Sequence, residues 1–348
     1  MKIVDQKPRL SYDDVLIKPL RSRISSRSEV SLESEFCGNK FSIPIISSNM
    51  DTITEANMAK KMSALGGLGL IHRYMSVEKQ IGFLSGWENN LGPIAVSVGT
   101  LKNDKLRIDT TIDYIINMSS LRTKNAIICV DIAHGHSEHM IDTIKYIRRN
   151  GFSGGLMAGA VCTPEGTRDL LDAGADIVRV GIGGGSVCTT RVKTGCGYPQ
   201  LSAVMECASV GPIIADGGIR TPGDAAKAMA AGAKAVMLGG MLAGTDCVPG
   251  WMPHASYMRF RGMASAEARE AFGQAGVNAE GVSCDVPTKP PGSTETVITE
   301  VAEGIRSAMS YSNSVNLKEF NDKAEFVLVT SSTIAENNPH ILNRKSRE

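Results

Sequence analysis

The stretch PIIADGGIRTPGDAAKAMAAGAKAVMLGG (residues 212–240) contains two short apolar runs, 212–216 and 233–239. Between them, the segment TPGDAAKAMAAGA places apolar residues at three- and four-residue spacing, which is typical of an amphipathic helix. A short run that is apolar on both faces is typical of a buried parallel strand. The stretch therefore predicts one strand–helix–strand unit of a parallel sheet.

The same alternation extends over most of the chain. Helical patterns such as SEHMIDTIKYIRR separate six further apolar runs, at residues 44–47, 67–71, 93–98, 126–131, 155–159 and 176–181. Eight strand–helix repeats predict a closed (β/α)₈ TIM barrel, with a doubly wound open sheet as the alternative. We expect one catalytic domain over residues 1–330, including an N-terminal extension, and a polar tail over residues 331–348.

Two segments interrupt this rhythm, namely the loop at residues 181–198 and a glycine- and proline-rich stretch at about residues 243–293. Long irregular segments in a compact domain are usually functional. We therefore expect the first to be a catalytic loop and the second to be an irregular active-site flap.

Bulk composition excludes several classes of protein. The 37 lysines and arginines nearly balance the 36 aspartates and glutamates, so no global field favours nucleic acid or an anionic membrane. No apolar signal segment opens the chain and no run of eighteen apolar residues occurs, which predicts a cytoplasmic protein. The eight cysteines show no zinc-finger spacing, so we expect reduced thiols.

Polar residues and glycines follow the predicted strands. In a barrel these positions form the active-site face, and paired glycines let several backbone N–H groups point at one anion. The pairs at 217–218 and 239–240 predict a phosphate site, although each pair could also simply form a tight turn.

The segment GIGGGSVCTTR (residues 181–191) carries the strongest candidate for chemistry. Cys188 lies on a glycine-rich loop beside Arg191, a setting that exposes a thiol and favours the thiolate, although a lone cysteine can be purely structural. His134, His136 and His139 could bind a metal, but turn or ligand contacts fit them better. A dinucleotide fingerprint after the first strand is absent from the sequence.

The longer stretch GIGGGSVCTTRVKTGCGYPQLSAV (residues 181–204) resembles the catalytic loop of the IMP dehydrogenase/GMP reductase family. The resemblance extends from LSYDDVLIKP (residues 10–19) to about Val329. It implies a barrel enzyme whose cysteine, here Cys188, forms an adduct at purine C2 while a nicotinamide cofactor exchanges hydride there. In the mechanism that follows, Thr190 and Glu280 move the proton.

The resemblance also implies ligand sites and an assembly state. Potassium would be held in the loop of Gly183, Gly185, Cys188 and Arg191, and the family is typically a homotetramer. The nucleotide (GMP or IMP) would contact Ser186, Asp216, Gly217, Gly218, Gly239, Gly240, Gly262, Met263, Ser265 and Gly281, with Asp216 accepting from the ribose. The cofactor would contact Ser26, Arg27, Arg73, Asp131, Ile132, Ala133, Ile182, Gly183, Met263, Ser307 and Ser310, and Arg27 or Arg73 could pair with the 2′-phosphate of NADPH.

Several features favour the reductase branch of the family, which converts GMP to IMP and ammonia with NADPH. The chain carries no CBS insert between residues 74 and 90, and between Gly262 and Glu280 it lacks the Arg-Tyr pair that activates water in the dehydrogenases. The motifs SSRSEV, SSNMDT and RVKTGCGYPQLSAV resemble reductases, whereas HRYMSVEKQ and DIAHGHSE resemble dehydrogenases. A dehydrogenase without CBS modules and a catalytically silent nucleotide-binding barrel stay as alternatives.

The chain also departs from the family pattern at two places. Ala160 stands where the family usually has asparagine, and Gly276-Val277 replaces a tyrosine-arginine pair of many reductases. Either change could alter recognition of the base or placement of the cofactor.

Overall fold

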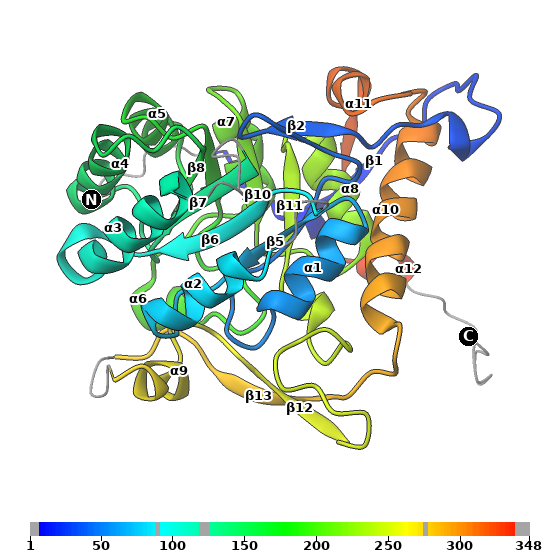
Figure 1. Ribbon diagram of the computed structural model, residues 1–348. Helices are drawn as coiled ribbons and strands as arrows, with labels where there is room; N and C mark the ends of the chain where they lie inside the picture. Colours follow the sequence, from blue (N-terminus) through cyan, green and yellow to red (C-terminus); the bar gives the residue numbers. More distant parts are fainter. Residues whose placement is uncertain (1–6, 88–90, 118–124, 274–277, 338–348) are drawn as a thin grey trace.

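A computed structural model describes residues 7–87, 91–117, 125–273 and 278–337, and it confirms the (β/α)₈ barrel (Figure 1). All eight predicted strands are present, and their bounds differ from the predicted ones by at most a few residues. The barrel closes where β11 pairs with β4, with Val236 opposite Ile45 and Leu238 opposite Ser47. The strands are β4 (Ile45–Ser47), β5 (Leu68–Ile71), β6 (Ile94–Val98), β7 (Ala126–Asp131), β8 (Gly155–Val161), β9 (Ile177–Val180), β10 (Ile213–Asp216) and β11 (Ala235–Leu238).

Helices surround the barrel and follow most of the strands. Several begin at a capping residue, as in α8, where the Thr221 side chain accepts from the Asp224 N–H and Pro222 occupies the first turn. The helices are α1 (Ala56–Ala64), α2 (Val77–Ser85), α3 (Leu101–Asn117), α4 (Glu138–Arg149), α5 (Pro164–Asp172), α7 (Gln200–Ala208), α8 (Pro222–Ala230) and α10 (Ser293–Tyr311).

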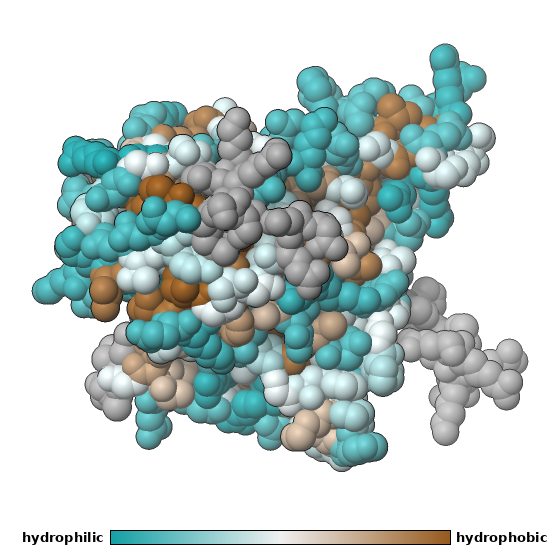
Figure 2. All heavy atoms as spheres, viewed as in Figure 1, coloured by the Kyte–Doolittle hydropathy of each residue, from teal (hydrophilic) through white to brown (hydrophobic). Residues whose placement is uncertain are grey.

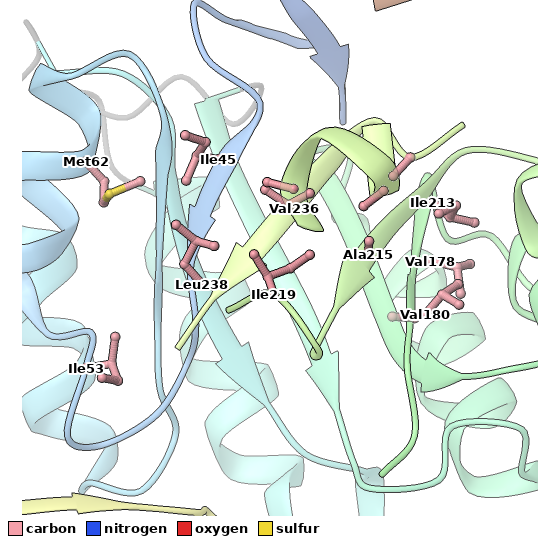
Figure 3. Packing of buried hydrophobic residues seen from close by; sticks show 14 of the residues in the cluster. Ile45, Ile53, Met62, Val178, Val180, Ile213, Ala215, Ile219, Val236 and Leu238 are labelled. Carbon is pink, nitrogen blue, oxygen red and sulfur yellow. The ribbon is translucent and has the colours of Figure 1, made fainter. Parts of the chain in front are cut away.

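The barrel has two apolar cores because its strands are buried on both faces. Outward-facing residues such as Val178, Val180 and Ile213 pack against the helices, as Figure 3 shows for one side of the barrel. Inward-facing residues such as Ile177, Ile214 and Met157 fill the barrel interior. Burial on both sides explains why the strand sequences are continuous apolar runs rather than alternating ones.

A short hairpin near the N-terminus closes one end of the barrel. It consists of β2 (Ser34–Phe36) and β3 (Asn39–Phe41), whose phenylalanine rings Phe36 and Phe41 stack at 4.2 Å and belong to the interior core. Its turn needs positive φ at Cys37 (51°) and Gly38 (68°), and the Asn39 amide donates to the Cys37 carbonyl at 2.8 Å. The hairpin lies at the opposite end from the flap (Figure 1).

A separate two-stranded sheet joins the N-terminal and C-terminal parts of the domain. After the short helix η1 (Tyr12–Asp14), strand β1 (Val15–Ile17) pairs antiparallel with β14 (Phe326–Leu328), which follows α11 (Leu317–Lys323). The predicted polar tail over residues 331–348 includes a short helix, α12 (Thr333–Glu336), and residues 338–348 lie outside the described part.

The flap is more regular than the sequence analysis expected. Its strands β12 (Tyr257–Arg261) and β13 (Ser283–Pro287) form an antiparallel ribbon that carries the short helix α9 (Ala266–Ala271) at the lower edge of Figure 1. In β12, Met258 and Phe260 are buried while Tyr257 and Arg259 are exposed. This period of two is the normal pattern of a strand with one covered face, so the expectation of an irregular segment was wrong.

Most side chains on the face shown in Figure 2 are hydrophilic, with apolar side chains in separate patches. Among the described residues, no helix combines the length and apolarity needed to cross a bilayer.

We predict that Gly69→Ala destabilises the barrel. A Cβ added at Gly69 would lie 2.4 Å from the Ala59 Cα, so strand β5 and helix α1 would have to separate. The expected loss is about 3 kcal/mol of unfolding free energy, measured by urea unfolding. Gly82→Ala is the matched control, because its Cβ would meet nothing within 4 Å and should stabilise α2 slightly. Equal midpoints for the two variants would contradict the prediction.

Candidate active site

The predicted catalytic loop leaves β9 and is held against the end of the flap. The Thr189 N–H donates to the Glu280 carbonyl at 2.9 Å, and the Val282 N–H donates to the Val187 carbonyl at 2.9 Å. Cys188 and Gly281 form an isolated antiparallel bridge between them. Backbone pairing therefore brings together two segments that are about ninety residues apart in the sequence.

Three predicted catalytic side chains form one hydrogen-bonded chain. The Cys188 thiol donates to Thr190 Oγ1 at 3.2 Å, and the Thr190 hydroxyl donates to Glu280 Oε2 at 2.9 Å. A hydroxyl between a thiol and a carboxylate can pass a proton in either direction. This arrangement can therefore support nucleophilic attack coupled to proton transfer.

The other cysteines differ from Cys188 in their surroundings. All eight cysteines are free thiols, and Cys37, Cys129 and Cys207 are buried. Burial raises the pKa of the Cys129 thiol to about 12 and that of Cys207 to about 11, so both stay protonated at neutral pH. Cys196 and Cys284 are exposed, and Cys162 and Cys247 are intermediate in exposure.

The loop contains a short helix, α6 (Thr190–Thr194), whose first residue is Thr190. The predicted loop at residues 181–198 is therefore irregular only in part. The Arg191 side chain donates to the Tyr198 carbonyl at 2.6 Å, and its Cγ lies 2.6 Å from where a Cβ on Gly183 would be. Glycine at 183, with φ of 82°, leaves the room that this arginine occupies.

The glycines predicted to hold a phosphate converge on the catalytic loop. A Cβ on Gly240 would lie 2.7 Å from Ser186 Oγ, and a Cβ on Gly217 would lie 3.4 Å from the Gly185 nitrogen. Gly239 caps the short helix η4 (Gly240–Leu242), and Gly217 and Gly218 have φ of 98° and 79°. The loops after β9, β10 and β11 thus meet around Ser186, and their glycines leave room there for an anion.

The flap supplies the remaining predicted nucleotide residues. Gly262 and Gly281 pass close to Val187, where a Cβ on Gly262 would lie 3.1 Å from the Val187 carbonyl oxygen. Ser265 is buried and uses its hydroxyl to accept from the Ala268 N–H at 3.2 Å, which caps α9. The structure therefore gives Ser265 a local role that occupies its side chain.

Comparison with known proteins identifies the family. The model of the IMP dehydrogenase / GMP reductase domain matches residues 9–340. The chain belongs to the IMP dehydrogenase/GMP reductase family. The resemblance deduced from the motifs is thus confirmed.

Individual members of the family are similar over nearly the whole length. GMP reductase 2 of Bos taurus is 40% identical, covering 95% of this chain and 97% of its own. GMP reductase of Yersinia pestis (strain Pestoides F) is 39% identical, covering 94% and 96%. A crystal structure of a GMP reductase variant from Trypanosoma brucei in complex with guanosine 5′-monophosphate superimposes with a TM-score of 0.86 at 28% identity, covering 96% and 98%.

The cofactor residues that the family resemblance implies fall into two separate groups. Asp131, Ile132 and Ala133 end β7 at the barrel mouth, where Arg73, Ile182, Gly183 and Met263 also lie on strand-end loops or the flap. Ser26 and Arg27 instead belong to the N-terminal segment at η2 (Arg27–Glu29), beside the C-terminal half of α10 with Ser307 and Ser310. Figure 1 shows the blue N-terminal segment beside the upper end of α10 at the upper right, away from the flap. Within a single chain, the cofactor residues at the barrel mouth and those near η2 are therefore apart.

The chain departs from the family pattern at Ala160 and at Gly276-Val277. Ala160 is buried, and its N–H donates to the Ile132 carbonyl at 3.0 Å, so backbone alone makes the contact at this position. Gly276-Val277 lies outside the described residues.

Of the three histidines, His136 pairs with Asp169 at 2.8 Å, and the described residues contain no cluster of side chains suited to a metal.

Two features of this family member were not singled out from the sequence. Arg179, a buried arginine on β9, joins Asp131 to Asp216, and Arg261 on the flap joins Asp51 of the loop after β4. A charged residue within an apolar strand run was the available signal for Arg179, because such residues are rarely buried without partners.

The flap is fastened to the barrel rim at two points. Arg261 donates twice to Asp51 Oδ2, at 3.0 and 2.5 Å, and the Tyr74 and Phe272 rings stack with centroids 4.7 Å apart. Arg261 also reaches Glu267 on α9 at 2.9 Å. These contacts hold the ribbon in the position from which Glu280 reaches Thr190.

We predict that Arg261→Gln loosens the flap. The Asp51 carboxylate is only 10% exposed, so losing its partner should cost about 1–3 kcal/mol and speed hydrogen exchange across residues 257–287. The control is Arg259→Gln on the same strand, whose side chain is 46% exposed and whose ion pairs contribute little. Equal exchange rates in the two variants would show that the Arg261 pair does not fasten the flap.

Proposed function

We propose that the chain reduces GMP to IMP with release of ammonia, using NADPH. The observation that carries this proposal is the hydrogen-bonded chain from Cys188 through Thr190 to Glu280. The similarity to proteins named GMP reductase over nearly the full length supports it.

In this mechanism the Cys188 sulfur forms a bond to C2 of GMP. Glu280 passes a proton through the Thr190 hydroxyl to the 2-amino group. The C2–N bond then breaks, ammonia is released, and the purine stays on Cys188 as a thioimidate. When bound, NADPH supplies the hydride that C2 receives. The C2–S bond then breaks, and the Cys188 thiolate and IMP are released.

Substrate placement rests on the glycine-lined anion site and the mouth of the barrel. The phosphate would lie on Ser186, Gly217, Gly218, Gly239 and Gly240, and the Asp216 carboxylate would accept from ribose hydroxyls. Gly262, Met263, Ser265 and Gly281 would cover the nucleotide from the flap. The Met263 sulfur already accepts from the Asp51 N–H at 3.3 Å, which fixes this part of the flap over the mouth.

The residues at the mouth fit a cofactor rich in acceptors. Arg73 has a buried Nε without a partner among the described residues, so a ligand acceptor could satisfy it. Asp131, Ile132, Ala133, Ile182 and Gly183 would contact the nicotinamide half. Arg27 is exposed on the N-terminal segment, and it stays in this proposal as a partner for the 2′-phosphate. An unchanged KM for NADPH in Arg27→Ala would remove it.

The catalytic loop also offers backbone carbonyl oxygens, which are the kind of ligand that a potassium ion takes. Carbonyl oxygens are suited to this hard monovalent ion. Gly183, Gly185 and Cys188 would provide them, although the Gly185 carbonyl already accepts from the Cys188 N–H at 3.1 Å. The Arg191 carbonyl, the remaining ligand of this proposal, likewise accepts from the Gly195 N–H at 3.1 Å. Bound there, the ion would order the loop that carries the nucleophile.

Assembly as a homotetramer would unite the two groups of cofactor residues. Ser26, Arg27, Ser307 and Ser310 of one subunit could then complete the mouth of another, which light scattering can test by giving the mass of the assembly. We also place the protein in the cytoplasm, because its cysteines are free thiols.

The test is to supply purified protein with GMP plus NADPH and, separately, with IMP plus NAD. Oxidation of NADPH with IMP as product is expected from the first mixture. Formation of NADH and XMP from the second would instead identify a dehydrogenase. Tight binding of GMP without turnover in either mixture would identify a silent nucleotide-binding barrel.

A further inference from the structure

Arg179 occupies an unusual place for a charged residue. On β9 the outward residues Val178 and Val180 belong to the outer core, while Ile177 belongs to the barrel interior. Arg179 has the same parity as Ile177 and therefore points into the barrel, where its side chain is only 8% exposed. A cation buried to this degree needs partners.

Its partners are the two carboxylates at the mouth. Nη1 donates to Asp131 Oδ1 at 2.5 Å, while Nη2 and Nε donate to Asp216 Oδ2 at 2.6 and 3.2 Å. Burial alone would lower the pKa of the Arg179 guanidinium, but the charges of Asp216 and Asp131 outweigh it and hold that pKa well above its usual range. The guanidinium thus stays charged and spans the interior from β7 to β10.

The neighbouring strand is shaped around this arginine. A Cβ on Gly159 would lie 2.6 Å from the Arg179 Cβ and 2.7 Å from its carbonyl oxygen, so only glycine leaves the space. Asp131 and Gly159 are paired in the β7–β8 register, which sets the acidic partner beside the gap.

One cation between two carboxylates leaves a net negative charge and fixes one oxygen of each. The other oxygens, Asp131 Oδ2 and Asp216 Oδ1, then have set directions. Without the guanidinium, the two carboxylates would repel each other and each would have to be ordered by its own ligand.

We propose that Arg179 is a positioning residue that couples the nucleotide site to the cofactor site by holding Asp216 and Asp131 through one guanidinium. The inference rests on the proposed function, which assigns Asp216 to the nucleotide ribose and Asp131 to the cofactor. It predicts that a change at Asp131 is felt by GMP even when no cofactor is present. Removing the charge of Asp131 leaves the guanidinium to Asp216 alone, which weakens that carboxylate as an acceptor for the ribose.

The test is a double-mutant cycle on GMP binding by calorimetry, with no cofactor added. Asp131→Asn is expected to weaken GMP binding by about tenfold, and this effect should disappear in the Arg179→Lys background, because one ammonium cannot bridge both carboxylates. Steady-state assays should show the KM values for GMP and NADPH rising together in Arg179→Lys. Asp109→Asn on α3 is the control, because among the described residues this carboxylate accepts only from Lys105 Nζ and from Tyr146 Oη of α4, and it should leave GMP binding unchanged.

Thermal unfolding of each variant separates coupling from a general loss of structure. The inference is overturned if Asp131→Asn leaves the Kd for GMP unchanged, or if its effect has the same size in the Arg179→Lys background. Turnover by the unsubstituted protein is a separate result. If that protein reduces GMP while the cycle shows no coupling, the proposed function stands and only the inference fails; if it neither binds nor reduces GMP, both fail.

Discussion

Cys188→Ala is expected to abolish GMP reduction while leaving GMP binding nearly unchanged. The sulfur makes the bond to C2, so its loss removes the reaction path rather than a share of binding energy. Loss of a covalent nucleophile typically lowers kcat by about 10⁴-fold or more. Turnover is measured by NADPH absorbance and binding by calorimetry with GMP.

The matched control for this prediction is Cys196→Ala. Cys196 is exposed and lies eight positions further along the same segment, where its thiol contacts the Thr194 carbonyl at 3.8 Å. Its loss should leave kcat within about twofold, as is usual for surface substitutions. Full activity of Cys188→Ala would exclude covalent catalysis by this residue.

Thr190→Val is expected to produce the second largest effect, because it cuts the only connection between Cys188 and Glu280 recorded among the described side chains. Valine keeps the shape and removes the hydroxyl. Loss of general acid–base catalysis should lower kcat by about 10²–10⁴-fold with little change in the KM for GMP.

Three companion variants sharpen this result. Thr190→Ser keeps the hydroxyl and should recover most of the activity, whereas Glu280→Gln removes the titratable end of the chain and should resemble Thr190→Val. Thr194→Val on the same short helix serves as the control, since its hydroxyl contacts backbone groups alone: it donates to the Thr190 carbonyl at 2.7 Å and accepts from the Cys196 N–H at 3.0 Å. A normal kcat in both Thr190→Val and Glu280→Gln would mean that the proton takes another route.

The barrel could be predicted from the sequence because each of its strands is buried on both faces. Runs such as 126–130 and 213–215 are continuously apolar, and this follows directly from their position between two cores. The flap ribbon was missed because Tyr257, Arg259 and Arg261 alternate with only two apolar residues in a stretch rich in glycine and proline. A short two-stranded ribbon gives a weak pattern, and its partner strand lies some twenty residues further on.

The site shows the same contrast between local and long-range information. Cys188 and Thr190 lie two positions apart, so the loop sequence alone places both residues close to one reacting carbon. The contact of Glu280 with Thr190 depends on backbone pairing across about ninety residues, and only the family resemblance indicated it. The ion pairs of Arg179 depend on how β7, β9 and β10 are placed relative to one another. A single sequence does not reveal this placement.

The central claim is that C2 of GMP loses its amino group and receives a hydride, and isotopic labelling tests it most directly. GMP carrying ¹⁵N in the 2-amino group is incubated with the protein and NADPH deuterated at C4, in both prochiral forms. The predicted result is IMP with deuterium at C2 from one of the two forms, together with one equivalent of ¹⁵N-ammonium per NADPH oxidised. Retention of ¹⁵N in the nucleotide, or IMP without deuterium from either form, would contradict it.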